Sequence, residues 1–229
     1  MLAVRPGAGQ TLRGLGKVDC IAERRAPRET RNIQQEPPWR VRDRVPSGQF
    51  VTDKFPVLTF GPSQRVDTAD WRLRVFGLVE TERAWTWEEF LALAQVTVKA
   101  DFHCVTQWSR LDNTWQGVPF RDVMRHVKPL AQARHVMVHC YGGYTANLAL
   151  SAVMEDDVLL AHRHDGEPLA PDHGGPMRLI VPQRYAWKSA KWVSGLELLE
   201  DDSAGFWERR GYHMRGDPWR EERFWPELS

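Results

Sequence analysis

Midway along the chain the sequence reads Asp101-Phe102-His103-Cys104-Val105-Thr106-Gln107-Trp108-Ser109-Arg110. Its one cysteine, Cys104, follows a predicted strand and stands beside His103. A cysteine in such a place is a buried structural thiol, a nucleophile or a soft metal ligand, and free Cys is among the most buried residue types. A nucleophile needs a base that a third group orients, and the scattered histidines define no such partner. The run by itself leaves these alternatives open.

A zinc site is another interpretation of this run. The dipeptide His103-Cys104 has a counterpart in His139-Cys140. Neighbouring residues on a strand point to opposite faces, so all four side chains could meet one ion only with a turn or bulge at each dipeptide. A zinc-stabilised interaction module is therefore one alternative function.

Composition bounds the class of protein. The chain has 229 residues, 42% of them hydrophobic, enough for one compact domain with a core. Its 31 Lys and Arg against 30 Asp and Glu give no electrostatic reason to expect a nucleic-acid partner. Three cysteines cannot make a disulfide framework, and no apolar run reaches the roughly 20 residues of a membrane span. We expect a cytoplasmic protein with no membrane span.

Tryptophan is unusually frequent, with 11 residues in the chain. Trp buries a large area but needs a partner for its N–H, so this count suits either ordinary core packing or a lined pocket.

The order of predicted elements favours an α+β fold. Residues 1–44 show no apolar period and are predicted to be an N-terminal extension, partly disordered. Thr86 and Glu89 form a capping box that opens a short helix over 87–93, and Pro119 begins a second helix. Strands are predicted at 71–79, 134–139, 177–181 and 192–199. Strands and single helices mix without regular alternation, which argues against a doubly wound sheet.

A second run, Asp172–Arg178, has the composition of an anion site. Gly174 and Gly175 let backbone N–H groups approach a ligand, while His173 and Arg178 can add charge-assisted hydrogen bonds to a phosphate. Lys188 and Lys191 follow one predicted strand later, and no Gly-x-Gly-x-x-Gly or P-loop pattern supports an ordinary nucleotide site.

Taken in order, these motifs resemble the sulfite oxidase-type molybdopterin-dependent oxidoreductase family, including its small haem-free bacterial members. The likeness runs from about Phe50 to Tyr212. It implies a sulfite oxidase-type molybdopterin-binding fold of mixed β-sheets with short helices. It also implies a molybdenum-molybdopterin cofactor, with Cys104 as the protein ligand of the metal, a role that a thiolate suits.

The resemblance also implies which residues hold the rest of the cofactor. His173 and Arg178 match pterin-phosphate ligands, and the family's next cofactor-contacting tripeptide falls on Ser189-Ala190-Lys191. Near the start of the likeness, Thr52, Asp53 and Lys54 match a cofactor-binding run. Thr52 stands where sulfite oxidases carry an arginine that helps to hold the anionic substrate, which argues against sulfite as the substrate.

The substrate side of the site is implied by two further residues. The run Trp207–Tyr212 resembles a family motif whose tyrosine hydroxyl reaches the oxo group and the substrate, which assigns that role to Tyr212. Arg110 is predicted to supply positive potential where oxygen charge develops. We thus expect a catalytic domain at 45–200 and a C-terminal tail, 201–229, that completes the active site.

The predicted function is oxygen-atom transfer on a small oxo-sulfur compound, with electrons exchanged with a separate haem or flavin protein. A non-catalytic molybdopterin-binding protein is the other alternative, because of the departure at Thr52.

Overall fold

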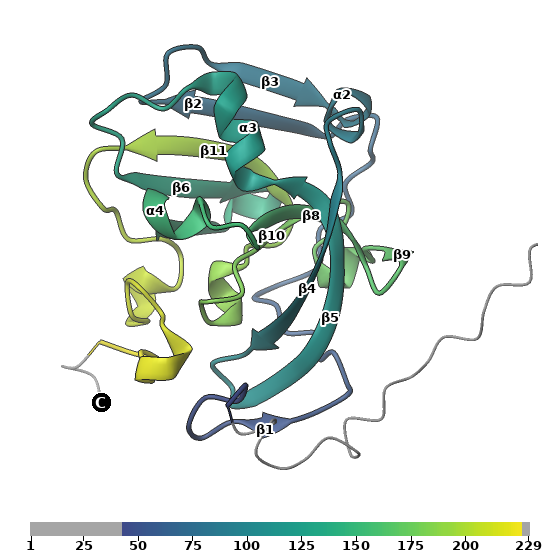
Figure 1. The fold of residues 1–229 in the computed structure, drawn as a ribbon, viewed down its shortest axis with the longest axis vertical. Coiled ribbons are helices and arrows are strands. Elements are labelled where there is room, and N and C mark those ends of the chain that lie inside the picture. The colour runs from purple at the N-terminus through teal and green to yellow at the C-terminus, as the bar shows by residue number, and fades with distance from the viewer. Residues whose placement is uncertain (1–42, 226–229) are drawn as a thin grey trace, which may run out of the picture. The chain divides into compact units, whose positions relative to one another are not determined.

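The computed structural model describes residues 43–225, which form two β-sheets with short helices (Figure 1). The mixed sheets and short helices confirm the α+β prediction. The predicted N-terminal extension lies outside the described residues, apart from Asp43 and Arg44.

The first sheet has five strands in the order β3-β2-β11-β6-β7. Their bounds are β2 Arg72–Gly77, β3 Arg83–Thr86, β6 His135–Cys140, β7 Thr145–Ala149 and β11 Val193–Leu199. In β2, Leu73 and Val75 are buried between exposed neighbours, as expected of a strand with one buried face. Strand β11 pairs parallel with β2 and antiparallel with β6, so the sheet is mixed.

The second sheet has six strands, ordered β1-β5-β8-β10, with β4 paired to β5 and β9 paired to β8. Their bounds are β1 Phe50–Val51, β4 Val96–His103, β5 Trp108–Pro119, β8 Leu159–His164, β9 Glu167–Pro168 and β10 Arg178–Ile180. Strands β4 and β5 form a long curved pair below the five-stranded sheet (Figure 1). The tight turn between them carries Cys104, whose carbonyl accepts a hydrogen bond from the Gln107 N–H at 3.0 Å.

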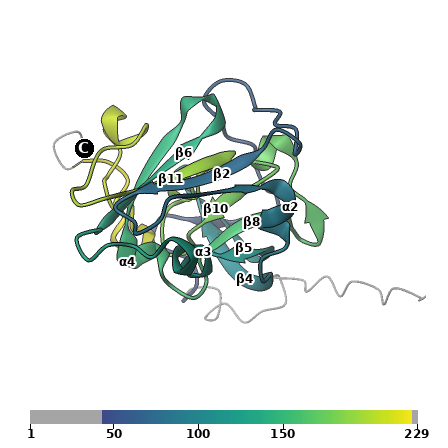
Figure 2. The same cartoon turned by 90° about the horizontal axis from the view of Figure 1, so that it is seen from above.

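The two sheets pack face to face over the main core. Leu73 of β2 and Leu196 of β11 belong to the same buried cluster as Leu160 of β8 and Leu179 of β10. Seen from above, β6, β11 and β2 lie over β10, β8 and β5 (Figure 2). A smaller cluster, with Phe102, Trp108 and Trp115, lies along β4 and β5 and includes Cys104.

Three α-helices occur within residues 43–225, namely α2 Trp87–Leu91, α3 Phe120–Val127 and α4 Leu150–Val153. The capping box is confirmed: the Glu89 N–H donates to the Thr86 hydroxyl at 3.2 Å, and the Thr86 N–H donates to the Glu89 carboxylate at 2.8 Å. In α3 the predicted apolar face, Phe120, Val123, Met124 and Val127, is buried.

The short 3₁₀ segments lie in the connections. They are η2 Tyr141–Gly143, η3 Pro171–His173, η4 Ala186–Lys188, η5 Glu208–Arg210 and η6 Pro218–Arg220.

The strands predicted from the sequence correspond to β2, β6, β10 and β11, with ends shifted by one or two residues. Strand β5 was not predicted as a strand. Its polar residues are typical of a loop, but Ser109 and Asn113 are fully buried and hydrogen-bonded. Ser109 pairs with the His103 ring, and the Asn113 side-chain amide donates to the Ala100 and Arg110 carbonyls.

Candidate functional site

A cavity of about 390 Å³ opens where the β4–β5 turn, the segments around η3 and η4, and the C-terminal segment meet. Seven of the residues predicted from the sequence line it: Cys104, His173, Arg178, Ser189, Ala190, Lys191 and Tyr212. These residues come from four separate parts of the chain, so the fold brings the predicted motifs together.

Cys104 is a buried residue on the wall of this cavity, with 6% of its surface exposed. Its Sγ lies 3.1 Å from the hydroxyl Oγ1 of Thr106. Burial raises the pKa of the Cys104 thiol, and the Thr106 hydrogen bond acts against that rise. Thr106 is thus placed to stabilise the thiolate form, the form that binds a metal.

The glycine run 174–175 shapes a second wall. A Cβ at Gly175 would lie 2.1 Å from the Leu169 carbonyl oxygen, so only glycine allows the chain to pass there. The turn leaves His173 with its ring stacked on Phe55 at 4.3 Å between ring centroids. The buried Nδ1 of His173 has no hydrogen-bond partner within residues 43–225.

Arg178 is a buried cation, 2% exposed, set among aromatic rings. Its terminal nitrogens donate to the carbonyls of His173 at 2.9 Å and Ser189 at 2.8 Å, so the side chain joins the two loops. Its Nε is buried without a partner, and no carboxylate of the described residues pairs with it. Burial lowers the pKa of Arg178 to about 10, because removal from water disfavours the charged form.

Lys191 adds a second cation beside Arg178. Its Nζ donates to the carbonyls of Leu58 at 3.1 Å and Asp172 at 2.6 Å. Burial, together with the charge of Arg178, lowers the pKa of Lys191 to about 7. The charge of Asp172 only partly offsets this lowering, so a bound anion would stabilise the charged forms of both side chains.

Tyr212 also lines the cavity and comes from the C-terminal segment. Its ring packs against Trp187 at 5.1 Å and Trp207 at 4.9 Å between centroids. Burial raises the pKa of Tyr212, and the charge of Cys104 raises it further. The phenol therefore remains protonated, as a hydrogen-bond donor, at neutral pH.

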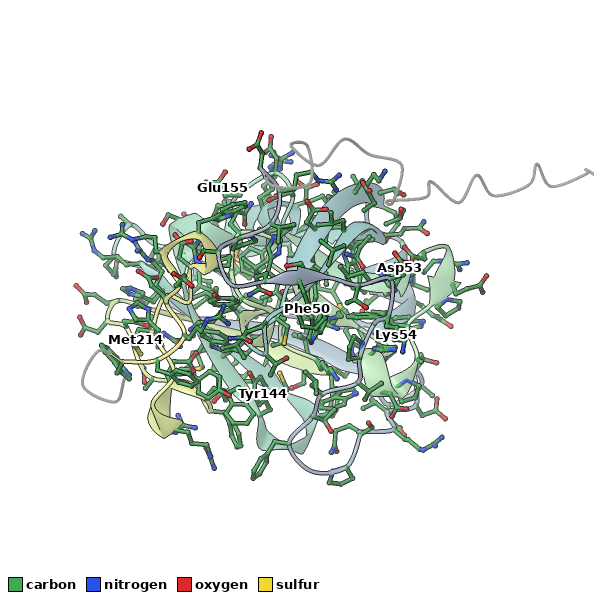
Figure 3. The ribbon with its side chains drawn as sticks, turned by 90° about the horizontal axis from the view of Figure 1, so that it is seen from below. Phe50, Asp53, Lys54, Tyr144, Glu155 and Met214 are labelled. Atoms are coloured by element: carbon green, nitrogen blue, oxygen red, sulfur yellow. The ribbon has the colours of Figure 1, made fainter. Side chains whose placement is uncertain are left out.

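Four predicted residues do not line the cavity. Thr52, Asp53 and Lys54 lie in the segment after β1, and the latter two are exposed on the surface (Figure 3). The Thr52 hydroxyl accepts from the Lys54 N–H at 3.1 Å. Phe55, the next residue along, does reach the cavity.

Arg110 is engaged away from the cavity. Its guanidinium donates to Asp165 at 2.6 Å, to Asn113, and to the Asp53 carbonyl at 3.3 Å. Because Asp165 neutralises it, Arg110 has little positive potential to offer a substrate in this arrangement.

Several lining residues were not predicted individually, namely Phe55, Thr106, Tyr144, Trp187, Phe206 and Trp207. The abundance of Trp was the available signal, and both of its interpretations hold. Trp71, Trp85 and Trp115 are core residues, whereas Trp187 and Trp207 line the cavity.

The zinc interpretation finds no support in the geometry. His139 lies in the five-stranded sheet and contacts Glu197 at 2.8 Å, whereas Cys104 is in the other sheet's turn. Across residues 43–225 no group of three or more His, Cys, Asp or Glu is placed to hold a metal ion. Within the same range, no helix has the length and apolar character to cross a bilayer.

Comparison with known proteins shows the family of the chain. The model of the oxidoreductase molybdopterin binding domain matches residues 60–207. The chain is 46% identical over 182 residues to the "Uncharacterized oxidoreductase YuiH" of Bacillus subtilis, covering 79% of this chain and 92% of that one. It is 33% identical over 153 residues to the "Putative protein-methionine-sulfoxide reductase subunit YedZ1" of Azospira oryzae, covering 67% of this chain and 58% of that one.

A solved structure shares the fold. The sulfane dehydrogenase SoxCD of Paracoccus pantotrophus matches with a TM-score of 0.57 at 24% identity, covering 61% of this chain and 41% of that one.

Proposed function

Because the chain belongs to the sulfite oxidase-type family of molybdopterin oxidoreductases, an enzyme family whose cofactor is molybdenum-molybdopterin, we propose that it transfers an oxygen atom on a small oxo-sulfur substrate. The observation that carries the proposal is the cavity itself, whose lining includes Cys104 and two basic side chains, the buried Arg178 and the half-buried Lys191.

The residues present fit an anionic cofactor. Within residues 43–225 neither Arg178 nor Lys191 forms an ion pair with a carboxylate, although the charge of Asp172 acts on Lys191, and the buried His173 Nδ1 has no hydrogen-bond partner. Burying unpaired cations is costly, so a phosphate-bearing group at this end would stabilise the site. We assign His173, Arg178 and the run 189–191 to that phosphate end, and Cys104 to the metal. Thr52, Asp53 and Lys54 stay predictions from the sequence.

When bound, the cofactor supplies a two-electron redox centre with an exchangeable oxygen. The chain's own residues perform the remaining work. The Cys104 thiolate would hold the metal, and the Thr106 hydroxyl, 3.1 Å from that sulfur, would then be the donor in the hydrogen bond between them. The Tyr212 hydroxyl, kept protonated by burial, donates a hydrogen bond where charge develops on the transferred oxygen.

The charge pattern favours a neutral oxo-sulfur substrate over sulfite. Sulfite, a dianion, gains affinity from converging guanidinium groups. Here Arg110 is paired with Asp165, and Arg178 is committed to two loop carbonyls. The cavity is instead lined toward the surface by apolar side chains, including Leu58, Phe60 and Phe206. The similarity to YedZ1, which is named as a putative protein-methionine-sulfoxide reductase subunit, also supports a sulfoxide substrate.

We propose that electrons come from a separate haem or flavin protein, because a reduction must be supplied with two electrons and two protons for each sulfoxide converted to sulfide and water. A cytoplasmic location is part of the same proposal and rests on the free thiols Cys104 and Cys140.

The decisive experiment uses protein made in cells that synthesise molybdopterin. Molybdenum and pterin should be stoichiometric, and reduced viologen should drive reduction of methyl phenyl sulfoxide faster than a dye-coupled assay oxidises sulfite. Stoichiometric cofactor without turnover of either compound would favour the non-catalytic alternative. Efficient sulfite oxidation at micromolar substrate would refute the choice of substrate but not the oxygen-transfer chemistry.

A further inference from the structure

A fully buried ion pair joins two segments that line the cavity. The Nζ of Lys188 lies 2.6 Å from a carboxylate oxygen of Glu208, and both side chains are 0% exposed. The same Nζ donates to the Asn147 carbonyl at 2.9 Å and to the Asn147 side-chain oxygen at 2.8 Å. All three protons of the ammonium group therefore have acceptors.

The carboxylate of Glu208 is held from a second side. The indole N–H of Trp187 donates to the same oxygen of Glu208 at 2.8 Å. Asn147, which accepts hydrogen bonds from Lys188, also donates one from its side-chain amide to the Asp202 carboxylate at 2.8 Å. The ion pair thus belongs to a network that links β7, η4 and the C-terminal segment.

Such a pair is a weak source of stability. Desolvating two charges is costly, and apolar residues of similar volume often stabilise a fold as well or better. Burial lowers the pKa of Lys188, and only the nearby Glu208 and Asp202 carboxylates act against that cost. The position of the pair beside the cavity points instead to a role in holding the residues of the site.

Both partners stand next to residues of the site. Lys188 immediately precedes the run Ser189-Ala190-Lys191 on the cavity wall, and Glu208 lies in η5, four residues before Tyr212. The Trp187 ring, fixed by Glu208, packs edge-on against the Tyr212 ring. The pair therefore connects the segment that carries Ser189, Ala190 and Lys191 to the segment that carries Tyr212, and both segments line the cavity.

The backbone around Glu208 is fitted closely to this arrangement. A Cβ on Gly205 would lie 2.5 Å from a Glu208 carboxylate oxygen and 2.9 Å from the Thr145 carbonyl. The Phe206 N–H donates to that same carbonyl at 2.9 Å. Beyond Tyr212, the Gly216 carbonyl accepts from the Tyr185 N–H at 2.8 Å. The segment is thus anchored on both sides of Tyr212.

We propose that Lys188 and Glu208 are positioning residues whose ion pair holds Tyr212 at the cavity, through Trp187 and the η5 backbone. The proposal rests on the proposed function, in which the Tyr212 hydroxyl donates to the transferred oxygen. It adds that the geometry of this hydroxyl is set by a contact outside the reacting atoms. A displacement of about 1 Å is enough to lower a rate on the order of a hundredfold.

A double-mutant cycle tests the coupling in the cofactor-loaded enzyme. Glu208→Gln, Tyr212→Phe and the combined variant are compared for kcat per bound molybdenum in viologen-coupled sulfoxide reduction. If Glu208 acts through Tyr212, the combined variant will be no slower than Tyr212→Phe alone, within about twofold. Glu197→Gln is the matched control, because the Glu197 carboxylate also contacts a side chain, the His139 ring at 2.8 Å, but no residue from 193 to 201 lines the cavity, whereas Glu208 lies between Trp207 and Tyr212, which do.

The outcomes separate the two proposals. Losses that multiply in the combined variant would overturn the positioning role and leave Tyr212 in the proposed function. A Tyr212→Phe enzyme with unchanged turnover would refute the assignment of Tyr212, and the positioning role with it.

A second variant tests the proposal if Glu208→Gln fails to fold because it leaves Lys188 unpaired. Lys188→Met combined with Glu208→Gln removes both charges and leaves no unpaired ion in the core. Trypsin should then cleave the full-length enzyme faster after the exposed residues Arg209 and Arg210, at an unchanged melting temperature. Unaltered cleavage there, with unaltered kcat, would show that the pair does not hold the segment.

Discussion

The Sγ of Cys104 and the hydroxyl of Thr106, 3.1 Å apart, share the wall of the cavity. The tight turn between β4 and β5 brings them together, since the Gln107 N–H closes onto the Cys104 carbonyl. The turn thus presents a sulfur toward the cavity together with a donor that can stabilise its charged form. A buried thiol without such a donor would be held more firmly in its protonated state.

Cys104→Ser should abolish activity and leave the fold nearly intact, because an alcohol is a poor ligand for this metal. Sulfoxide reduction, molybdenum content and melting temperature are the measurements. Cys20→Ser and Cys140→Ser serve as controls and should retain most activity, although Cys20 lies outside the described residues and Cys140 is a core residue. Equal loss of metal in Cys104→Ser and Cys140→Ser would instead favour the zinc interpretation.

Thr106→Val should lower the reduction potential of the loaded enzyme. Its hydroxyl withdraws charge from the Cys104 sulfur, and without that donor a more electron-rich thiolate favours the oxidised metal. Redox titration followed by optical spectroscopy measures the shift. Thr106→Ser keeps the hydroxyl and should restore the original value. Identical potentials in the Val and Ser variants would exclude the tuning role.

Arg178→Ala and Lys191→Ala should lower cofactor content, not the rate per bound cofactor. One charge-assisted hydrogen bond is worth about 1.5–3 kcal/mol, so each change should weaken binding on the order of tenfold to a hundredfold. Pterin release after denaturation gives the content. Lys128→Ala is the matched control, because Lys128 is an exposed cation paired with Glu80. Full cofactor with slow turnover would contradict the assignment.

Arg178→Ala should also lower the melting temperature of the cofactor-free protein more than Lys191→Ala does, because the Leu58 and Asp172 carbonyls that Lys191 contacts are exposed to water. The Arg178 guanidinium donates to the His173 and Ser189 carbonyls, which would be left buried without these donors.

Arg110→Gln tests whether Arg110 contacts the substrate, as the sequence predicts, or stabilises the fold through its hydrogen bonds. The loss of its bonds to Asp165 and Asn113 should cost about 1 kcal/mol, which lowers the melting temperature by about 2–4 °C. The KM for sulfoxide should stay within about twofold, since changes away from the substrate remove no binding contact. A large rise in KM at an unchanged melting temperature would instead support a substrate-binding role.

Local patterns made much of this site predictable. The capping box at Thr86 and Glu89 depends on residues three apart, and the glycine turn after His173 depends on the residues within it. Each motif of the site consists of residues that are close together in the sequence, so its chemical groups can be recognised without the fold. The roles of Cys104 and Lys191, however, came from the family resemblance and not from local pattern alone, and the fold places both residues on the cavity.

Contacts between distant segments were not predictable in the same way. Arg110 forms an ion pair with Asp165, which is 55 residues away along the chain. Phe55 reaches the cavity while Thr52, three residues earlier, does not, because the segment after β1 has no periodic pattern that fixes its side chains. The Lys188–Glu208 pair was equally hidden, since an isolated Lys or Glu is usually solvated.

Anion binding to the cofactor-free protein should depend on pH through Lys191. Its pKa is lowered to about 7, so the ammonium is charged at pH 6 and largely neutral at pH 8.5. Arg178, with a pKa of about 10, keeps its charge at both values, while burial and Arg178 lower the pKa of His173. Because the protonated amine binds an anion more tightly, affinity is full well below pH 7 and is lost as pH rises through that value.

Sulfate is the suitable probe, because it remains a dianion across this range. Its binding stabilises the folded state by an amount that grows with affinity, so it should raise the melting temperature more at pH 6 than at pH 8.5. Lys191→Met should remove that difference while leaving the contribution of Arg178. Equal sulfate effects at the two pH values in the unmodified protein would show that Lys191 does not take part in holding the anion.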